Sequence, residues 1–64
     1  MEPKAIINYK GYLIELHQDQ NDYSYEYVVK DKDGKVVGAS HNQYQIIDDA
    51  DVNAKMLVAM LVNK

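Results

Sequence analysis

The sequence contains no cysteine, so neither a disulfide nor a thiolate metal site can reinforce the fold. A chain near this length of 64 residues buries only about 60% of the surface that its unfolded form exposes, which makes its stability marginal. Oligomerisation or a binding partner is the remaining way to add buried surface. The absence of cysteine is compatible with a reducing compartment, and we expect the protein to be cytoplasmic.

Runs of basic residues are also missing, and the net charge is −3. Nucleic-acid binding requires a basic stripe that neutralises phosphates, so neither nucleic acid nor an anionic membrane is expected as a partner. Met1-Glu2-Pro3 lacks the basic and apolar segments of a secretion signal. The apolar run near the C-terminus is too short to span a bilayer. These absences predict a soluble protein with no membrane association.

Catalytic and metal-binding motifs are absent too. The sequence has no serine on a glycine elbow and no phosphate-binding glycine loop. His17 and His41, which are expected at strand ends and able to approach each other, have no defined third ligand for zinc. Asp31-x-Asp33-Gly34 matches part of a calcium loop, but the twelfth position is Ser40 instead of glutamate, which favours a plain turn. We therefore expect no enzyme activity, cofactor, metal or small-molecule substrate.

Three segments alternate between apolar and polar residues with the period of two that is typical of strands. They are Tyr12–His17, Tyr23–Lys30 and Lys35–Ser40. Asp33-Gly34 joins the last two and predicts a hairpin turn with Gly34 in the left-handed conformation. Ala5–Tyr9 is a shorter extended stretch, broken at Lys10-Gly11, that is not counted in this sheet.

A helix is predicted over Asp48–Lys64, with Asp48 or Asp49 as its N-cap and Lys64 at its negative end. The order strand, strand, strand, helix predicts an α+β fold. In this fold, a three-stranded antiparallel β-meander carries one C-terminal α-helix on one face (β-β-β-α). Residues 1–64 are expected to form one small domain.

The predicted helix is apolar on more than one side, because the residues from Met56 to Val62 carry no polar side chain. At about 100° per residue, one group of apolar residues faces the sheet: Ala50, Ala54, Leu57, Val58 and Leu61. A second group lies roughly opposite: Val52, Met56, Ala59 and Met60. A row of exposed apolar side chains is typical of a binding surface, so the second group is the predicted protein interface.

Tyr23, Tyr25 and Tyr27 share one face of their predicted strand. Such a row stacks nucleic-acid bases in some proteins, but Glu26 lies within it and no arginine or lysine is interleaved. The favoured interpretation is that the tyrosines form the buried face of the sheet. Their expected apolar partners are Ile14, Leu16, Leu57 and Leu61.

One family shares these features. The chain resembles the YegP-like family of uncharacterised small bacterial proteins. The features that carry the resemblance are the run Tyr23-x-Tyr25-x-Tyr27-x-Val29, the segment Asp33-Gly34-Lys35-Val36-Val37, Ser40, Tyr44 and the Ala50–Ala54 helix segment. The resemblance covers roughly Ile14 to Val62 and implies a strand-strand-strand-helix unit. The family often carries this unit in tandem, which implies that a single unit pairs with a second copy. This chain departs from the family in having tyrosine where tryptophan is usual and an acidic helix start, and the family offers no catalytic residues to transfer.

Together these features predict a non-enzymatic protein-interaction module that self-associates as a homodimer through its helix. A different protein as partner is the first alternative. The second is a nucleic-acid-associated or regulatory module, for example one that binds a host factor if the chain is phage-borne. The face of the sheet without tyrosines is mixed in character and could be an interaction surface of its own: Leu13, Glu15, His17, Glu26, Val28 and Lys30.

Overall fold

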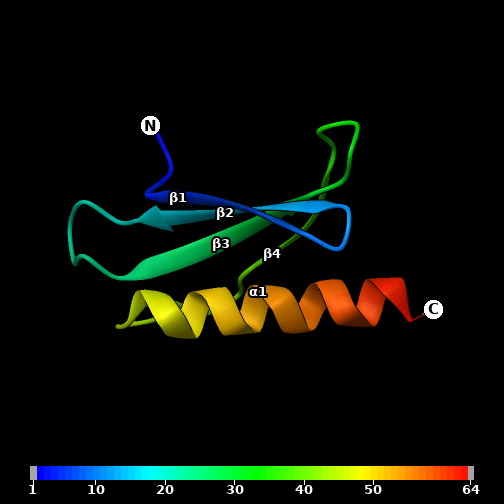
Figure 1. The fold of residues 1–64 in the computed structure, drawn as a ribbon. Coiled ribbons are helices and arrows are strands. Elements are labelled where there is room, and N and C mark those ends of the chain that lie inside the picture. Colours follow the sequence, from blue (N-terminus) through cyan, green and yellow to red (C-terminus); the bar gives the residue numbers. More distant parts are fainter. Residues whose placement is uncertain (1, 64) are drawn as a thin grey trace.

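The computed structural model describes residues 2–63, which form one antiparallel sheet with a helix on one face (Figure 1). The elements are β1 (Ala5–Tyr9), β2 (Tyr12–Gln18), β3 (Tyr25–Lys30), β4 (Val36–Ala39) and α1 (Ile47–Val62). The strands lie in the order β1-β2-β3-β4, and α1 packs beneath β2 and β3. The α+β class and the C-terminal helix are confirmed, but the prediction of three strands is wrong, since the described sheet has four.

The additional strand is β1, and the turn that follows it explains why it pairs. Lys10 and Gly11 both adopt positive φ, at 52° and 85°. A two-residue connection with both central residues in this region matches the right-handed twist of a hairpin. β1 therefore folds back directly onto β2, with Ile7 opposite Ile14 and Tyr9 opposite Tyr12. The Lys10-Gly11 pair is a hairpin connection and not a break in the sheet.

The turn between β3 and β4 is the predicted one. Gly34 has φ 83°, and its N–H donates to the carbonyl of Asp31 at 3.0 Å. The Asp31 carboxylate accepts the N–H groups of Asp33 at 2.9 Å and Lys35 at 3.0 Å. This aspartate therefore holds the turn closed through its own hydrogen bonds.

β3 begins two residues later than predicted. Tyr23 has φ 61°, and its side chain is 67% exposed, so it does not lie on the core face. The preceding loop closes on its own side chains: Asp19 accepts the N–H of Asn21 at 2.7 Å, and Asp22 accepts the N–H of Ser24 at 3.0 Å. Such local hydrogen bonds compete with the sheet for backbone groups, which delays the start of the strand.

The core is small and lies between the sheet and α1. It contains seven buried apolar residues: Ile14, Leu16, Tyr27, Val29, Ala50, Ala54 and Val58. The two alanines let the helix approach the sheet closely, because they have almost no side chain to hold it away. At β4 the Leu57 side chain fills the space where a Cβ on Gly38 would be, which couples α1 to this edge of the sheet.

α1 begins without a side-chain cap. The N-cap position is Ile46, so the prediction that Asp48 or Asp49 caps the helix is wrong. Both aspartates lie in the first turn, where their charge still complements the positive helix end. The predicted role of Lys64 lies outside the described residues. Within residues 2–63, no helix has the length and apolar character that crossing a membrane requires.

Candidate protein-interaction surface

The side of α1 that points away from the sheet is its most apolar exposed surface. Val52 is 53% exposed, Met56 59% and Met60 69%, while Ala59 beside them is half-buried. These four residues, here called the outward face of α1, lie opposite the buried Ala50, Ala54 and Val58 on the helix. The structure thus places all four predicted interface residues on one side of one element.

The flanks of α1 are occupied by contacts within the chain. On one flank, Lys55 Nζ lies 3.0 Å from Asp51 Oδ2 and 5.6 Å from the centre of the Tyr9 ring. On the other flank, Leu57 packs against Gly38. These contacts lie on the helix sides that border β1 and β4, whereas Val52, Met56 and Met60 on the outward face remain more than half exposed.

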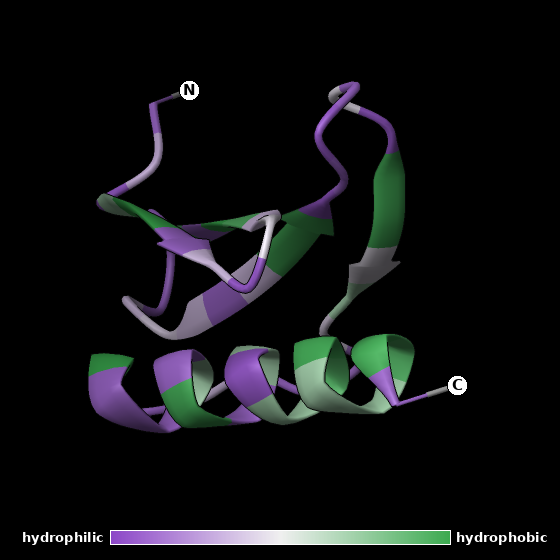
Figure 2. Ribbon diagram, turned by 45° about the vertical axis from the view of Figure 1, so that its right-hand side comes forward, coloured by the Kyte–Doolittle hydropathy of each residue, from purple (hydrophilic) through white to green (hydrophobic). Residues whose placement is uncertain are grey.

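The outward face is a continuous row and not a scatter of single residues. Val52, Met56 and Met60 are spaced four apart, which stacks them along one line of a helix at intervals of about 6 Å. In Figure 2 the hydrophobic colour extends around the C-terminal half of α1, whereas a hydrophilic band follows directly after the start of the helix. Asp48 and Asp49 lie in that first turn. The last turn carries no basic residue. The surface is thus apolar along most of its length and acidic at one end.

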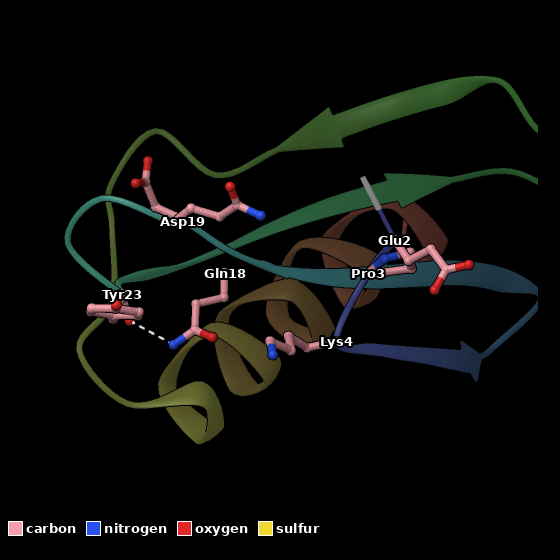
Figure 3. A pocket seen from close by; sticks show the side chains of 7 residues that line it. Glu2, Pro3, Lys4, Gln18, Asp19 and Tyr23 are labelled. Carbon is pink, nitrogen blue, oxygen red and sulfur yellow. Dashed lines mark hydrogen bonds between the residues drawn. The ribbon is translucent and has the colours of Figure 1, made fainter.

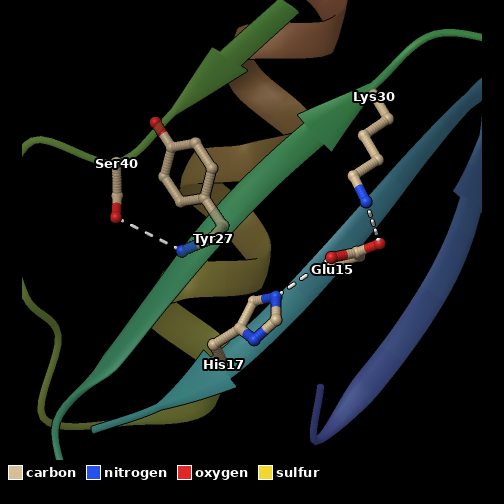
Figure 4. A network of polar contacts seen from close by, with 5 residues as sticks. All are labelled: Glu15, His17, Tyr27, Lys30 and Ser40. Atoms are coloured by element: carbon tan, nitrogen blue, oxygen red, sulfur yellow. Dashed lines mark hydrogen bonds and ion pairs between the residues drawn. The ribbon is translucent and has the colours of Figure 1, made fainter. Parts of the chain in front are cut away.

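A second exposed surface is the sheet face on the side opposite α1, and a polar network occupies its centre (Figure 4). Lys30 Nζ donates to Glu15 Oε2 at 2.8 Å, and His17 Nε2 lies 3.0 Å from Glu15 Oε1. The hydrogen bond with Lys30 has the largest effect on the Glu15 carboxyl, and the one with His17 has the second largest. Both lower the pKa of this carboxyl below its usual 4.5. His17 is therefore engaged with Glu15 and not with His41, which is exposed after β4.

Apolar side chains flank this network without forming a row. Val28 lies opposite Glu15 and Leu13 opposite Lys30 in the sheet register, and both are half-buried. Ile6 and Val36 extend the same face to the two edge strands and are 57% and 55% exposed. Because polar and apolar residues alternate across it, this face offers less continuous apolar surface than the outward face of α1.

The three tyrosines do not form a stacking platform. Tyr27 is buried beside Tyr44, with ring centres 6.3 Å apart, and burial raises the pKa of its hydroxyl, with a smaller effect from Tyr44. Tyr25 is half-buried against the core, as expected, but Tyr23 points into solvent. The exposure of this aromatic residue was not predicted from the sequence. The signal was present in Asp19 and Asp22, whose side chains bind the backbone of the preceding loop.

A surface cavity of about 580 Å³ lies beside this loop and the N-terminal segment (Figure 3). Glu2, Lys4 and Asp19 line it, but their charged ends point in different directions. Gln18 Nε2 donates to the carbonyl of Tyr23 at 3.2 Å, so that amide is already in use. The cavity therefore lacks the converging polar groups that orient a small ligand.

His17 and Glu15 form a pair, but no third candidate metal ligand joins them in the part of the chain that the structure describes. Between residues 2 and 63, no three or more His, Cys, Asp or Glu side chains come together in a group that could hold a metal ion. Asp31, which belongs to the partial match to a calcium loop, uses its carboxylate to close the β3–β4 turn.

Comparisons with protein-family models, curated proteins and solved structures find no match for this chain. The resemblance to YegP-like proteins therefore stays a prediction. The class that the described residues define is a small α+β domain with four antiparallel strands and one helix.

Proposed function

We propose that this chain is a non-enzymatic protein-interaction module that self-associates through the outward face of α1. The observation that carries the proposal is the row of Val52, Met56 and Met60, which remains more than half exposed although only seven apolar residues are buried between residues 2 and 63. A contiguous apolar row on the surface is typical of a binding site, whereas single exposed apolar residues are common everywhere.

The energetic gain from covering this row is large for a domain of this size. Complete burial of a valine or methionine side chain contributes roughly 1.5–3 kcal/mol. Since each of the three is already partly covered, the remaining gain is about 1–2 kcal/mol for each. In a domain of fewer than about 70 residues, the core contributes only some 3–5 kcal/mol to the free energy of unfolding. Association would therefore add a substantial share of the total stability.

A second copy of the chain is the partner we favour. A two-fold symmetric contact uses the same patch on both molecules and doubles the apolar area that it covers. Methionine is unbranched and polarizable, which suits a surface that must fit against its own copy. The resemblance to a family with tandem units agrees with pairing. An interface limited to one helical face is expected to be small, below about 1,200 Å² in total, so the dimer should be weak and depend on concentration.

Nucleic-acid binding remains the second candidate function and has less support. The sheet face opposite α1 carries Glu15 at its centre and Glu26 beside it, and the net charge of the chain is −3. Both features repel phosphate. Lys30 is already paired with Glu15, which reduces its availability for a phosphate group.

The proposal is tested by introducing charge into the outward face. The double variant Met56→Lys with Met60→Lys should remain monomeric, because two ammonium groups cannot be buried in an apolar contact without loss of hydration. Light scattering at high micromolar concentration should give about twice the 7.3 kDa chain mass for the unmodified protein and a single chain mass for the variant.

The matched control is Ile6→Lys with Val36→Lys, because these residues are similarly exposed but lie on the opposite surface of the domain. This control should keep the dimer mass. A single chain mass for the unmodified protein at high micromolar concentration would contradict self-association. Binding to a different protein would then require a partner from a cell extract that the unmodified chain captures and the methionine variant does not.

A further inference from the structure

We propose that the two copies pack α1 against α1 in antiparallel orientation across a two-fold axis that passes beside Met56. In this arrangement Val52 of each copy faces Met60 of the other. The inference rests on the proposed self-association and adds its orientation and register, which determine how the whole dimer is built.

The charge distribution of α1 selects the antiparallel orientation. The first turn carries the exposed carboxylates of Asp48 and Asp49, and the last turn carries no basic residue. The charge of α1 is therefore concentrated at its N-terminal end. A parallel pair would place two acidic first turns side by side, within the roughly 8–10 Å that separates packed helices. In the antiparallel pair these turns lie about 22 Å apart along the helix axes, which exceeds the Debye length of about 8 Å in physiological salt. The antiparallel pair therefore avoids the repulsion and also opposes the two helix dipoles favourably.

The spacing of the apolar residues selects the register. Val52 and Met60 lie four residues before and after Met56, so a two-fold axis beside Met56 brings every member of the row against an apolar residue of the partner. A shift of one helical turn toward the N-terminus would instead place Asp48 against the apolar Met56 of the partner. The half-buried Ala59, whose side chain is short, allows the helices to approach closely beside the axis.

The architecture leaves room for this contact. The sheet lies on the other side of α1, so nothing in the described chain stands between the outward face and an approaching helix (Figure 1). The dimer would have four layers, with the two helices inside and the two sheets outside. The network around Glu15 would then lie on both outer surfaces.

Cysteine cross-linking tests orientation and register, because the natural chain has no cysteine and each introduced thiol is unique. A disulfide requires Cα atoms about 4.4–6.8 Å apart. Under mild oxidation, Met56→Cys should form a linked dimer, and Val52→Cys mixed with Met60→Cys should form a linked mixed dimer. Val52→Cys alone should not link, since its two copies lie about 12 Å apart along the helix axes. Mass spectrometry separates the mixed dimer from dimers of either variant.

The control is Ile6→Cys, which is 57% exposed on the outer sheet surface and reports random collisions between molecules. The expected pairs should link several-fold more efficiently than this control. Efficient linking of Val52→Cys to itself, without the mixed dimer, would show a parallel pair and overturn this inference while self-association stands. A dimer mass in light scattering with all cysteines at the level of the control would overturn it as well, in favour of contact with the partner's sheet. A single chain mass would overturn both proposals.

Discussion

Glu15 shows how a single charged residue is held on a partly covered sheet surface. Its two carboxylate oxygens have different partners, Lys30 on the neighbouring strand and His17 two residues along the same strand. Its side chain is 15% exposed, so water reaches the carboxylate only partly. The partners stabilise the ionised form more than the limited burial destabilises it, which is why the pKa is lowered.

This arrangement predicts a pH-dependent effect of Glu15→Gln. A carboxyl group with a lowered pKa in the folded state stabilises the fold above its unfolded value of 4.5, and this contribution is lost as the pH falls through the lower folded value. The variant should therefore reduce the free energy of unfolding at neutral pH, by up to about 1 kcal/mol for such a partly exposed pair. At about pH 3 the difference should shrink or vanish.

The measurement is urea denaturation at both pH values, at one fixed protein concentration. Glu26→Gln is the matched control, because Glu26 lies opposite His17 on the same surface but is exposed and accepts only from Gln43 Nε2, at 3.2 Å. It should change the stability by less than about 0.5 kcal/mol at either pH. A loss for Glu15→Gln that is equal at both pH values would contradict this account.

At the scale of elements, the β1–β2 hairpin depends on the backbone conformation of its two-residue turn. Gly11 has φ 85°, and apart from Gly11 and its two chain neighbours no residue has an atom within 4 Å of the position that a Cβ would take. Any cost of a side chain there is therefore a cost of the backbone conformation and not of crowding. For a residue other than glycine, the left-handed conformation costs roughly 1–2 kcal/mol.

Gly11→Ala is accordingly expected to lower the free energy of unfolding by about 1–2 kcal/mol. Urea denaturation measures this change. Lys10→Ala is the control within the same turn, because it keeps a Cβ at φ 52° and should change the stability by less than about 0.5 kcal/mol. An unchanged stability for Gly11→Ala would mean that β1 contributes little to the folded state.

The elements also show what could be predicted from the sequence. The alternation in β2 and β3, the Asp33-Gly34 turn and the two-sided apolar pattern of α1 are local signals, and the structure contains all three. The pairing of β1 was missed because Lys10 is unusual at a position that favours asparagine or glycine. Tyr23 was placed on the core face because its alternation with Tyr25 continues the strand pattern, whereas the side chains of Asp19 and Asp22 fix a loop there. The helix cap was misplaced because Ile46, an apolar residue, occupies a position that usually carries a polar side chain.

For the interaction surface, the sequence predicted which residues lie together but not how much of each is covered. The helical period placed Val52, Met56, Ala59 and Met60 on one side of α1. Ala59 is half-buried, whereas the other three residues of this face are exposed. This difference depends on how the whole helix packs, which periodicity alone does not describe.

At the scale of the whole molecule, the domain buries few large side chains, and its helix is apolar on both its inner and outer sides. Among the seven buried apolar residues described, two are alanines, which contribute little apolar area. In the proposed dimer, a second copy covers the outward face of α1 and supplies stability that this core lacks. Folding and association are then linked, since the dimer forms only from folded chains.

The most direct test is the midpoint of thermal unfolding measured over a range of protein concentrations. Because association stabilises the folded state by mass action, the midpoint of the unmodified chain should rise with concentration. The Met56→Lys, Met60→Lys variant should show one midpoint at all concentrations. A concentration-independent midpoint for the unmodified chain would contradict the account.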